Sequence, residues 1–404
     1  MKLWKKKGIE LDKEVEEYTV GNDYILDNEL LPYDIKASKA HAKMLQACGY
    51  LTKEELEKLL AYLDEVEKLH SQGKFTVKQE DEDSHTAIEN YLVQKLGDVG
   101  KKIHTARSRN DQSMTMVRLF MLDKLNEVKK RTEQLQSALK SFAQKNKWVQ
   151  MPGYTHMRKA MPTTVDTLAM AYHDMLSDDL QLLDTVLKTI DTNPLGSAAG
   201  HGVPLRIDRQ MTTKELGFAK VQENPIHCAN TRGKYESLVI HVAFCIMQSL
   251  NKMATDLALF TMEEFGFFIL PDDMCTGSSI MPQKQNPDVL ELVRGNAHVV
   301  HGCLVTVNGI LLNLPTGYNR DFQLTKEPMT KSLKITDDSL KIMAKVFSRL
   351  KTQNTRLKTS MTPELYATEK AYELVAQGMQ FRDAYQKVAE ELSTLKFLAS
   401  RSHV

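Results

Sequence analysis

Apolar residues recur at a helical spacing in the middle of the chain, within segments that contain neither glycine nor proline. In the segment 101–151, Met114, Met121, Val128, Leu135 and Phe142 follow one another at intervals of seven residues. Because seven residues are close to two helical turns, these side chains line one face of a helix. The pattern therefore predicts a helix far longer than the usual three turns.

Four further segments have a similar character. Glycine and proline are absent from 163–193, from 234–264 and from 329–362, so each of these segments can also form a long helix. The segment 288–314 is apolar but contains Gly295, Gly302 and Gly309. We interpret it as one buried helix with close neighbours, and several shorter helices are the alternative. Five long helices in succession predict an all-α fold with an elongated central bundle.

Smaller helical domains are expected on both sides of this bundle. Thr52 and Glu55 form a capping box, which predicts the start of an N-terminal helix. Short helices are also expected after Pro363. We therefore divide the chain into an N-terminal helical domain (1–106), a central bundle (107–357) and a small C-terminal helical domain (358–404). The apolar face of the helix after Thr52 consists of Leu56, Leu59, Leu60, Leu63 and Val66.

Composition and charge narrow the class of protein. The 404 residues carry a formal net charge of +1, which gives no basis for binding nucleic acid or an acidic membrane surface. The five cysteines are scattered and odd in number, which argues against a disulfide framework or a zinc site. No signal peptide and no apolar stretch long enough to span a membrane is apparent, so we expect a cytoplasmic protein. The cysteines are Cys48, Cys228, Cys245, Cys275 and Cys303.

Phosphate-binding glycine motifs and the H-E-x-x-H metal motif are absent from the sequence, so we expect neither a cofactor nor a metal. Three polar segments between the long helices are the candidates for chemistry. The first is H-T-A-R-S-R-N-D-Q at 104–112. Its two arginines and the free N–H groups of a helix start are suited to bind a carboxylate or a phosphate. A capped helix start with solvated arginines is the alternative.

The second segment is 153–162, where Thr155 and His156 precede a long helix. We expect this histidine at the start of that helix, as an acid, a base or a substrate donor, or in a structural role. The third segment, 277–287, is G-S-S-I-M-P-Q-K-Q-N-P. Its two prolines keep Met281 and Asn286 out of helical angles, so the segment presents hydroxyl, amine and amide groups on an extended loop. A flexible linker is the alternative for this segment.

Together these segments resemble the fumarase/aspartase superfamily, whose signature G-S-S-x-M-P-x-K-x-N-P matches 277–287. Within it, the glutamine after Met-Pro, the segment 104–112, G-Y-T-H at 153–156 and Y-N-R-D-F-Q at 318–323 are similar to argininosuccinate lyases. The resemblance covers nearly the whole chain. It departs from the family at 4–8, where W-G-G-R-F is usual, and at 20–23, where a substrate-binding serine is expected. The family continues for several helical turns beyond the match at 381–384, which implies a shortened C-terminal domain.

The resemblance implies β-elimination of argininosuccinate to arginine and fumarate, the last step of arginine biosynthesis. It nominates Ser278 and His156 as the base and acid, with Glu291 orienting His156. We favour Ser278 as the base, and the reverse assignment stays open. Lys284 and Asn286 are suited to stabilise the dianion that forms when the proton leaves. The implied substrate-binding residues are Ser108, Arg109, Asn110, Thr155, Tyr318, Gln323 and Lys326.

The resemblance also implies a homotetramer whose sites are each built from three subunits. Two other functions are compatible with membership of the superfamily. One is another fumarate-releasing activity, such as that of adenylosuccinate lyase, and the segments 104–112 and 318–327 argue against it. The other is a non-catalytic structural role of the kind that lens crystallins have. The presence of Ser278, Lys284, Asn286 and His156 argues against that role.

Overall fold

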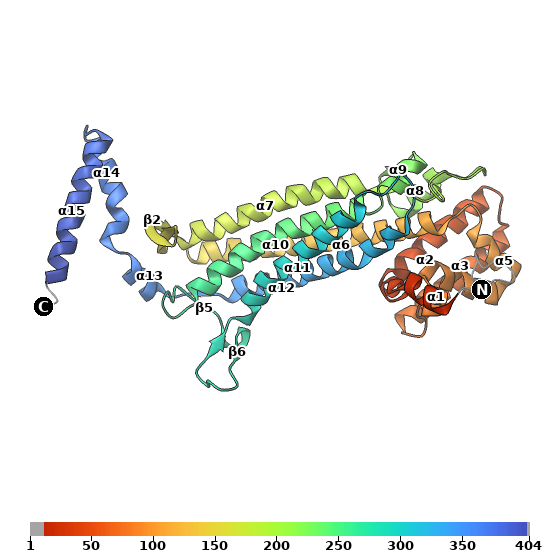
Figure 1. The fold of residues 1–404 in the computed structure, drawn as a ribbon, viewed down its shortest axis with the longest axis horizontal. Coiled ribbons are helices and arrows are strands. Elements are labelled where there is room, and N and C mark those ends of the chain that lie inside the picture. Colours follow the sequence, from red (N-terminus) through yellow and green to blue (C-terminus); the bar gives the residue numbers. More distant parts are fainter. Residues whose placement is uncertain (1–11, 402–404) are drawn as a thin grey trace. The chain divides into compact units, whose positions relative to one another are not determined.

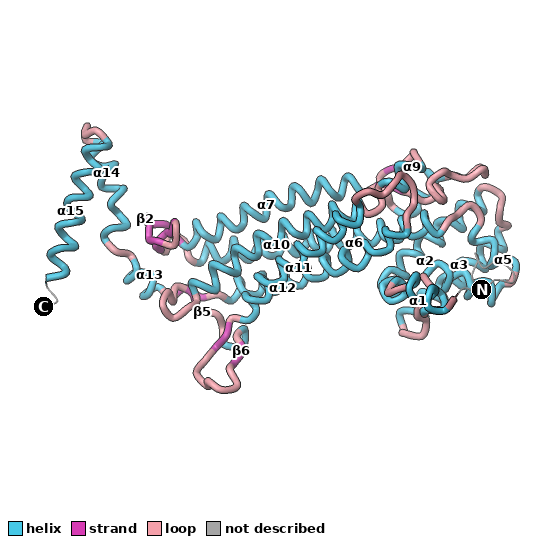
Figure 2. Tube along the Cα trace, in the orientation of Figure 1, coloured by secondary structure: helices cyan, strands magenta, loops and turns pink. Residues whose placement is uncertain are grey.

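The computed structural model describes residues 12–401, and it describes side chains as far as 394. The segment at 4–8, where the sequence departs from the family pattern, lies outside the described residues. Over the described range the protein is built from helices, with strands of two to seven residues. Figure 2 shows how little of the chain is strand. The all-α prediction is confirmed.

All five long helices form where the sequence predicts them (Figure 1). The apolar stripe of the first is buried along its length, which explains why so long a helix is stable. The apolar segment after residue 287 forms one unbroken helix, so the alternative of several shorter helices is wrong. The long helices are α6 (Arg109–Lys145), α7 (Val165–Ile190), α10 (Lys234–Phe260), α11 (Asp288–Leu311) and α12 (Lys326–Arg349).

The chain divides into two compact units, and each long helix contributes to both. The first unit comprises 1–129, 181–245 and 298–337. It contains the N-terminal helices, whose apolar faces form one core. The predicted capping box is present: the Thr52 hydroxyl accepts from Glu55 N, and the Glu55 carboxylate accepts from Thr52 N. The other helices of this unit are α1 (Lys13–Val20), α2 (Asp23–Ala47), α3 (Lys53–Ser71), α4 (Ser84–Leu96), α5 (Asp98–Lys101), α8 (Arg209–Leu216) and α9 (Pro225–Asn230). Helix α2, with 25 residues, is as long as the later helices of the bundle, which the sequence did not predict for the N-terminal part.

The second unit comprises 130–180, 246–297 and 338–404. Within it, polar contacts join neighbouring long helices: Gln136 Nε2 donates to Ser177 Oγ at 2.8 Å, and Ser249 Oγ donates to Asp179 at 2.7 Å. This unit also contains α13 (Asn354–Ser360), α14 (Ala367–Ala376) and α15 (Phe381–Arg401). The last two pack on each other through a small apolar core. The three-domain division drawn from the sequence stays a prediction.

One hairpin in the second unit departs from the sequence-based expectation. Strands β1 (Gln150–Thr155) and β2 (Arg158–Thr164) pair antiparallel, and α7 begins only at Val165. His156 and Met157 form the two-residue turn, with φ of 51° and 60°. Positive φ at both positions is the mark of a type I′ turn. The expectation that His156 lies at a helix start is therefore wrong, because the chain forms an antiparallel ladder before it becomes helical.

Three further strand pairs are short. Strand β3 (Thr192–Asn193) runs parallel to β4 (Lys220–Val221). Strand β5 (Phe268–Ile269) is antiparallel to β8 (Lys351–Thr352). Strand β6 (Thr276–Gly277) is antiparallel to β7 (Gln285–Asn286), so the signature segment forms a hairpin with an extended loop.

Two helices correct expectations about burial. Helix α10 is long and apolar enough to cross a membrane by length and composition alone, contrary to the prediction that no such stretch exists. In this structure 56% of its most apolar window is buried inside the protein, as in the core helix of a globular fold.

Helix α11 was expected to be buried, but one face of it is exposed. That face contains Leu292, Gly295, Val299, Gly302, Val305 and Gly309.

Candidate active site

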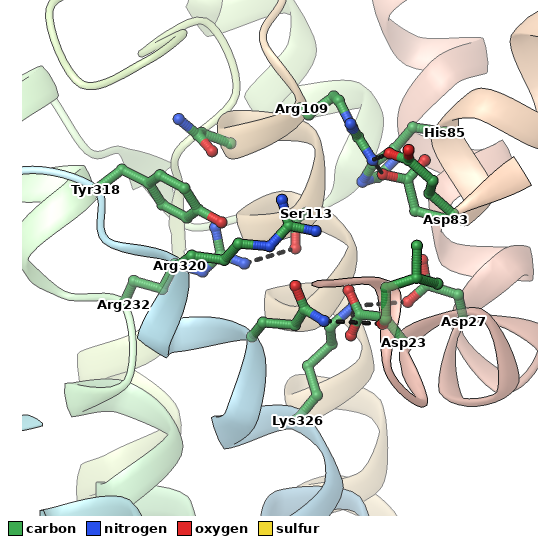
Figure 3. Close-up of a pocket in the computed structure, with 14 residues that line it drawn as sticks. Asp23, Asp27, Asp83, His85, Arg109, Ser113, Arg232, Tyr318, Arg320 and Lys326 are labelled. Atoms are coloured by element: carbon green, nitrogen blue, oxygen red, sulfur yellow. Dashed lines mark hydrogen bonds and ion pairs between the residues drawn. The ribbon is translucent and has the colours of Figure 1, made fainter. Parts of the chain in front are cut away.

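A cavity of about 170 Å³ in the first unit gathers most of the charged residues that the sequence singled out (Figure 3). Residues from α2, α4 and α6 contribute to it, together with the loop before α10 and the segment that leads into α12. Both signs of charge line the cavity, which suits a ligand that carries both. The lining residues are Val20, Asp23, Asp27, Glu82, Asp83, His85, Arg109, Asn110, Ser113, Arg232, Tyr318, Arg320, Gln323 and Lys326.

Lys326 is held by two carboxylates of α2. Its Nζ lies 2.8 Å from Asp23 Oδ1 and 2.8 Å from Asp27 Oδ1. Burial lowers the pKa of Lys326, but the two carboxylates outweigh burial and raise the pKa above its ordinary value. Burial raises the pKa of Asp23, against the lowering effect of Lys326. Because Asp23 and Asp27 are four residues apart, one helical face presents both to the same ammonium.

Arg109 begins α6 and is also paired within the chain. Its Nε donates to Asp83 Oδ2 at 2.7 Å, and its Nη2 donates to Glu82 at 3.1 Å. Asp83 caps α4 by accepting from Thr86 N at 2.8 Å. Burial raises the pKa of Asp83, but His85 and Arg109 outweigh burial and hold it below its usual range. Arg109 therefore lines the cavity while its guanidinium is already paired with carboxylates of its own chain.

The opposite side of the cavity has cations without a carboxylate partner. Arg232 Nη2 donates to Ser113 Oγ at 3.2 Å, and its guanidinium lies 4.9 Å from the centre of the Tyr318 ring. Arg320 Nη2 donates to the Thr19 carbonyl at 2.7 Å. Among the described residues no carboxylate lies within 4 Å of either guanidinium. In Figure 3 both arginines lie on the Tyr318 side of the cavity and extend toward Ser113.

The structure brings together five of the residues that the resemblance assigns to substrate binding. Ser108 is not among the lining residues, because its hydroxyl accepts from Asn110 N and its amide donates to Asp111, as at a capped helix start. Thr155 lies at the end of β1 in the second unit, beside the His156 turn. The five residues that line the cavity are Arg109, Asn110, Tyr318, Gln323 and Lys326.

The residues expected to perform the chemistry lie in the second unit and are largely exposed. Ser278 Oγ accepts from Met281 N at 3.1 Å in the loop between β6 and β7. Lys284 lines a separate cavity of about 760 Å³ beneath this loop, and Asn286 belongs to β7. His156 and Glu291 are exposed. Within the part of one chain that the structure describes, no hydrogen bond joins His156 to Glu291 or to Ser278.

Several lining residues were not expected from the sequence, in particular Asp23, Asp27, Arg232 and Arg320. The spacing of Asp23 and Asp27 was a detectable signal, since two acids at i, i+4 on a helix repel each other and a nearby cation relieves that repulsion. Arg232 gave no such signal, because its surroundings come from segments far apart in the sequence. The structure contains no group of three or more His, Cys, Asp or Glu residues, among those described, that could hold a metal ion.

The chain is similar in sequence to known lyases. A family model described as "Lyase" matches residues 10–302. The argininosuccinate lyase of Thermotoga neapolitana is 50% identical over 96% of this chain and 98% of its own length. That of Sorangium cellulosum is 39% identical over 98% of this chain and 91% of its own.

Solved structures show the same fold. An EDDS lyase in complex with formate is 25% identical, with a TM-score of 0.83, over 95% of this chain and 76% of its own. A fumarate lyase:delta crystallin from Brucella melitensis is 20% identical, with a TM-score of 0.80, over 94% of this chain and 88% of its own, and so shows the fold alone. By its relatives and by the family model, this chain belongs to the argininosuccinate lyase family.

Proposed function

We propose that this protein catalyses the β-elimination of argininosuccinate to arginine and fumarate, as a carbon–nitrogen lyase in arginine biosynthesis. The observation that carries the proposal is the cavity of the first unit. Five residues that the resemblance implies to bind substrate line it, together with acidic and basic side chains. Argininosuccinate has three carboxylates, an ammonium and a guanidinium, so it needs such a lining. The names of the 50% and 39% identical relatives support the same activity.

In the proposed reaction a base removes the proton from the carbon next to a carboxylate. The electron pair of that C–H bond forms the C=C bond of fumarate, and the C–N bond breaks. The departing guanidino nitrogen keeps the C–N pair and takes a proton from an acid. We assign the base to Ser278 and the acid side to His156, which Glu291 orients. The reverse assignment requires the same two residues.

The carbanion is the most demanding species in this sequence, because its charge spreads onto a carboxylate. A cation and a hydrogen-bond donor aimed at that carboxylate supply the largest stabilisation. Lys284 and Asn286 supply them in the proposal. Both belong to the hairpin of β6 and β7, whose loop presents polar groups to solvent in a single chain. A loop of this kind can close over a bound substrate and exclude water.

The proposal includes a homotetramer whose sites are shared between subunits. Helix α6 begins at Arg109 beside the cavity and ends at Lys145, five residues before the hairpin that presents His156. A helix of 37 residues rises roughly 55 Å at ~1.5 Å per residue, so α6 cannot bring its two ends together. In the proposal, another copy of the chain supplies His156 to the cavity.

The exposed face of α11 supports this assembly. Gly295, Gly302 and Gly309 recur every seven residues, and a Cβ atom added at any of them would meet open space. Leu292 and Val305 on the same face are 66% and 58% exposed. Small residues at a heptad spacing, flanked by exposed apolar residues, suit close packing against another helix. We assign that helix to a second copy of this chain, in a cytoplasmic protein with no nucleic-acid or membrane partner.

The function is tested by incubating the purified protein with argininosuccinate and following the ultraviolet absorbance of fumarate. Release of fumarate together with an equal amount of arginine supports the proposal. Adenylosuccinate in the same assay tests the alternative lyase activity. A folded protein that releases no fumarate from either substrate would support a non-catalytic, crystallin-like role instead.

A further inference from the structure

Arg232 is a buried cation that forms no ion pair with any carboxylate among the residues that the structure describes. Its side chain is only 9% exposed, and it lines the cavity of the first unit. The neighbours described for its guanidinium are the neutral Ser113 hydroxyl and the face of the Tyr318 ring. Burying a charge is costly unless it is paired or fully hydrogen-bonded. A guanidinium has five N–H donors, and one hydrogen bond leaves most of them unused.

Arg118, on α6, shows how this protein buries an arginine for structure alone. It is 2% exposed and stacks on the Tyr235 ring at 4.5 Å. Its guanidinium donates to the Thr192 carbonyl and hydroxyl and to Gln222 Oε1. It also reaches Thr231, and it does not line the cavity. Both terminal nitrogens of Arg118 thus donate to neutral acceptors within the fold, and only its buried Nε has no partner among the described residues. The unused donors of Arg232 instead border a cavity.

The carboxylates of the cavity do not satisfy Arg232. Asp23 and Asp27 are bound to Lys326. Glu82 and Asp83 are bound to Arg109. Arg232 lowers the pKa of Asp23 and of Glu236, so both feel its charge, but neither forms an ion pair with it within 4 Å.

The backbone holds Arg232 closely in place. Gly233, the next residue, has φ of 77°, and a Cβ atom there would lie 2.3 Å from Leu311 Cδ2. A glycine is therefore needed for the chain to turn into α10 against the segment that leads to Tyr318. Gly233 fixes the backbone end of Arg232, and Ser113 and the Tyr318 ring fix its guanidinium end.

We propose that Arg232 binds a carboxylate of the substrate, held for that task by Ser113 and Tyr318. The inference rests on the proposed function, because argininosuccinate supplies the carboxylate. A planar guanidinium can bind both carboxylate oxygens at once, which an ammonium cannot do. The carboxylate belongs either to the arginine half of the substrate or to the half that leaves as fumarate.

The test compares Arg232→Gln and Arg232→Lys with the intact protein. We expect Arg232→Gln to lower kcat/KM for argininosuccinate by about 10- to 100-fold, the usual effect of losing a charge-assisted hydrogen bond. Arg232→Lys keeps the positive charge but not the planar guanidinium that can bind two oxygens, so its kcat/KM should fall less. Arg206→Gln is the matched control, since Arg206 is exposed and outside the cavity. Melting temperatures show whether each variant is folded. If Arg232→Gln does not fold, the comparison of Arg232→Lys with the intact protein is the test.

Binding of the separate products identifies the carboxylate. Calorimetry with arginine, with agmatine (arginine without its carboxylate) and with fumarate is run on each protein. If Arg232 takes the arginine carboxylate, the intact protein prefers arginine to agmatine and Arg232→Gln loses that preference. If Arg232 binds a carboxylate of the half that leaves as fumarate, Arg232→Gln loses fumarate binding instead. Unchanged binding of all three, with kcat/KM within about twofold of the control, would overturn the inference.

The outcomes for Arg232 and for the proposed function are separate. An intact protein that releases no fumarate from argininosuccinate refutes the function. The product-binding measurements still decide whether Arg232 binds a carboxylate.

Discussion

The ammonium of Lys326 lies 2.8 Å from a carboxylate oxygen of Asp27, and both side chains are almost completely buried. The two residues are 299 positions apart in the sequence. Asp27 Oδ2 also accepts from Ser84 N at 3.0 Å, so this one carboxylate joins α2 to the start of α4 and to the first turn of α12. The floor of the cavity is therefore a buried ion pair that links three helices.

Removing one partner of this pair should destabilise the protein strongly. We expect Asp27→Asn to lower the free energy of unfolding by roughly 3 kcal/mol, because it leaves a buried ammonium with one carboxylate. Asp23→Asn should cost less, since burial already raises the pKa of Asp23 and opposes its charge. Urea unfolding at neutral pH measures both variants. The ion-pair account fails if Asp23→Asn is the more damaging of the two.

His85 should make stability depend on pH above 6.5, its ordinary pKa. Its Nδ1 lies 2.6 Å from Asp34 Oδ2. Burial lowers the pKa of His85, but the carboxylates of Asp34, Asp83 and Asp27 outweigh it and raise the pKa above 6.5. The folded protein therefore binds the proton more tightly than the unfolded chain, and this stabilisation is full below pH 6.5. It is lost as the pH rises through the folded pKa.

The urea midpoint measured between pH 6 and 10 should fall less steeply for His85→Gln than for the intact protein. His104 is the matched control, because burial and Arg107 lower its pKa to about 4. Its effect on stability has the opposite sign and is confined to the range between about 4 and 6.5. Identical pH profiles for His85→Gln and the intact protein above pH 6.5 would contradict the assignment.

Ser278→Ala should lower kcat by at least about 100-fold, because it removes the group proposed to take the proton. The fold should be unaffected, since Ser278 lies in an exposed loop and bonds only to nearby backbone amides. Ser279→Ala is the control, as the neighbouring serine is exposed and has no assigned role. Turnover is followed through fumarate absorbance. Similar kcat values for the two variants would remove Ser278 from the mechanism.

Gly302→Lys should break the proposed assembly. It puts a long charged side chain on the exposed glycine face of α11, where a single chain has open space but a close helix partner would not. We expect a molar mass below that of the intact assembly by size-exclusion chromatography with light scattering, together with lost turnover. Gln181→Lys adds the same charge at an exposed position of α7 and should leave the mass unchanged. An unaltered mass for Gly302→Lys would refute α11 as the interface.

Two inactive variants should restore each other if sites are shared. His156→Asn and Ser278→Ala chains are mixed in equal amounts, dissociated and reassembled. A site regains both residues when its histidine and its serine come from the appropriate parents. Random mixing in a symmetric oligomer gives this for roughly a quarter of the sites. Hybrids that are shown to be mixed, yet stay as inactive as either parent, would exclude shared sites.

The local features of this protein could be predicted from sequence because they depend on neighbouring residues. The stripe of apolar residues in α6 and the absence of glycine and proline were enough for the long helices. Thr52 and Glu55 were enough for the start of α3. The signature motifs identified the family and pointed to Arg109, Asn110 and Lys326, which the structure places in one cavity.

Only the tertiary structure decided what each of these residues meets. Arg109 was expected to be open to a substrate carboxylate, yet Asp83 and Glu82 already occupy its guanidinium. Arg232 had no distinguishing motif, and it acquires its place in the cavity from Ser113 and Tyr318. Ion pairs and burial depend on side chains that are distant in sequence, and local propensity holds no information about them. For the same reason the sequence predicted that α11 is a helix but not that one of its faces would be left exposed.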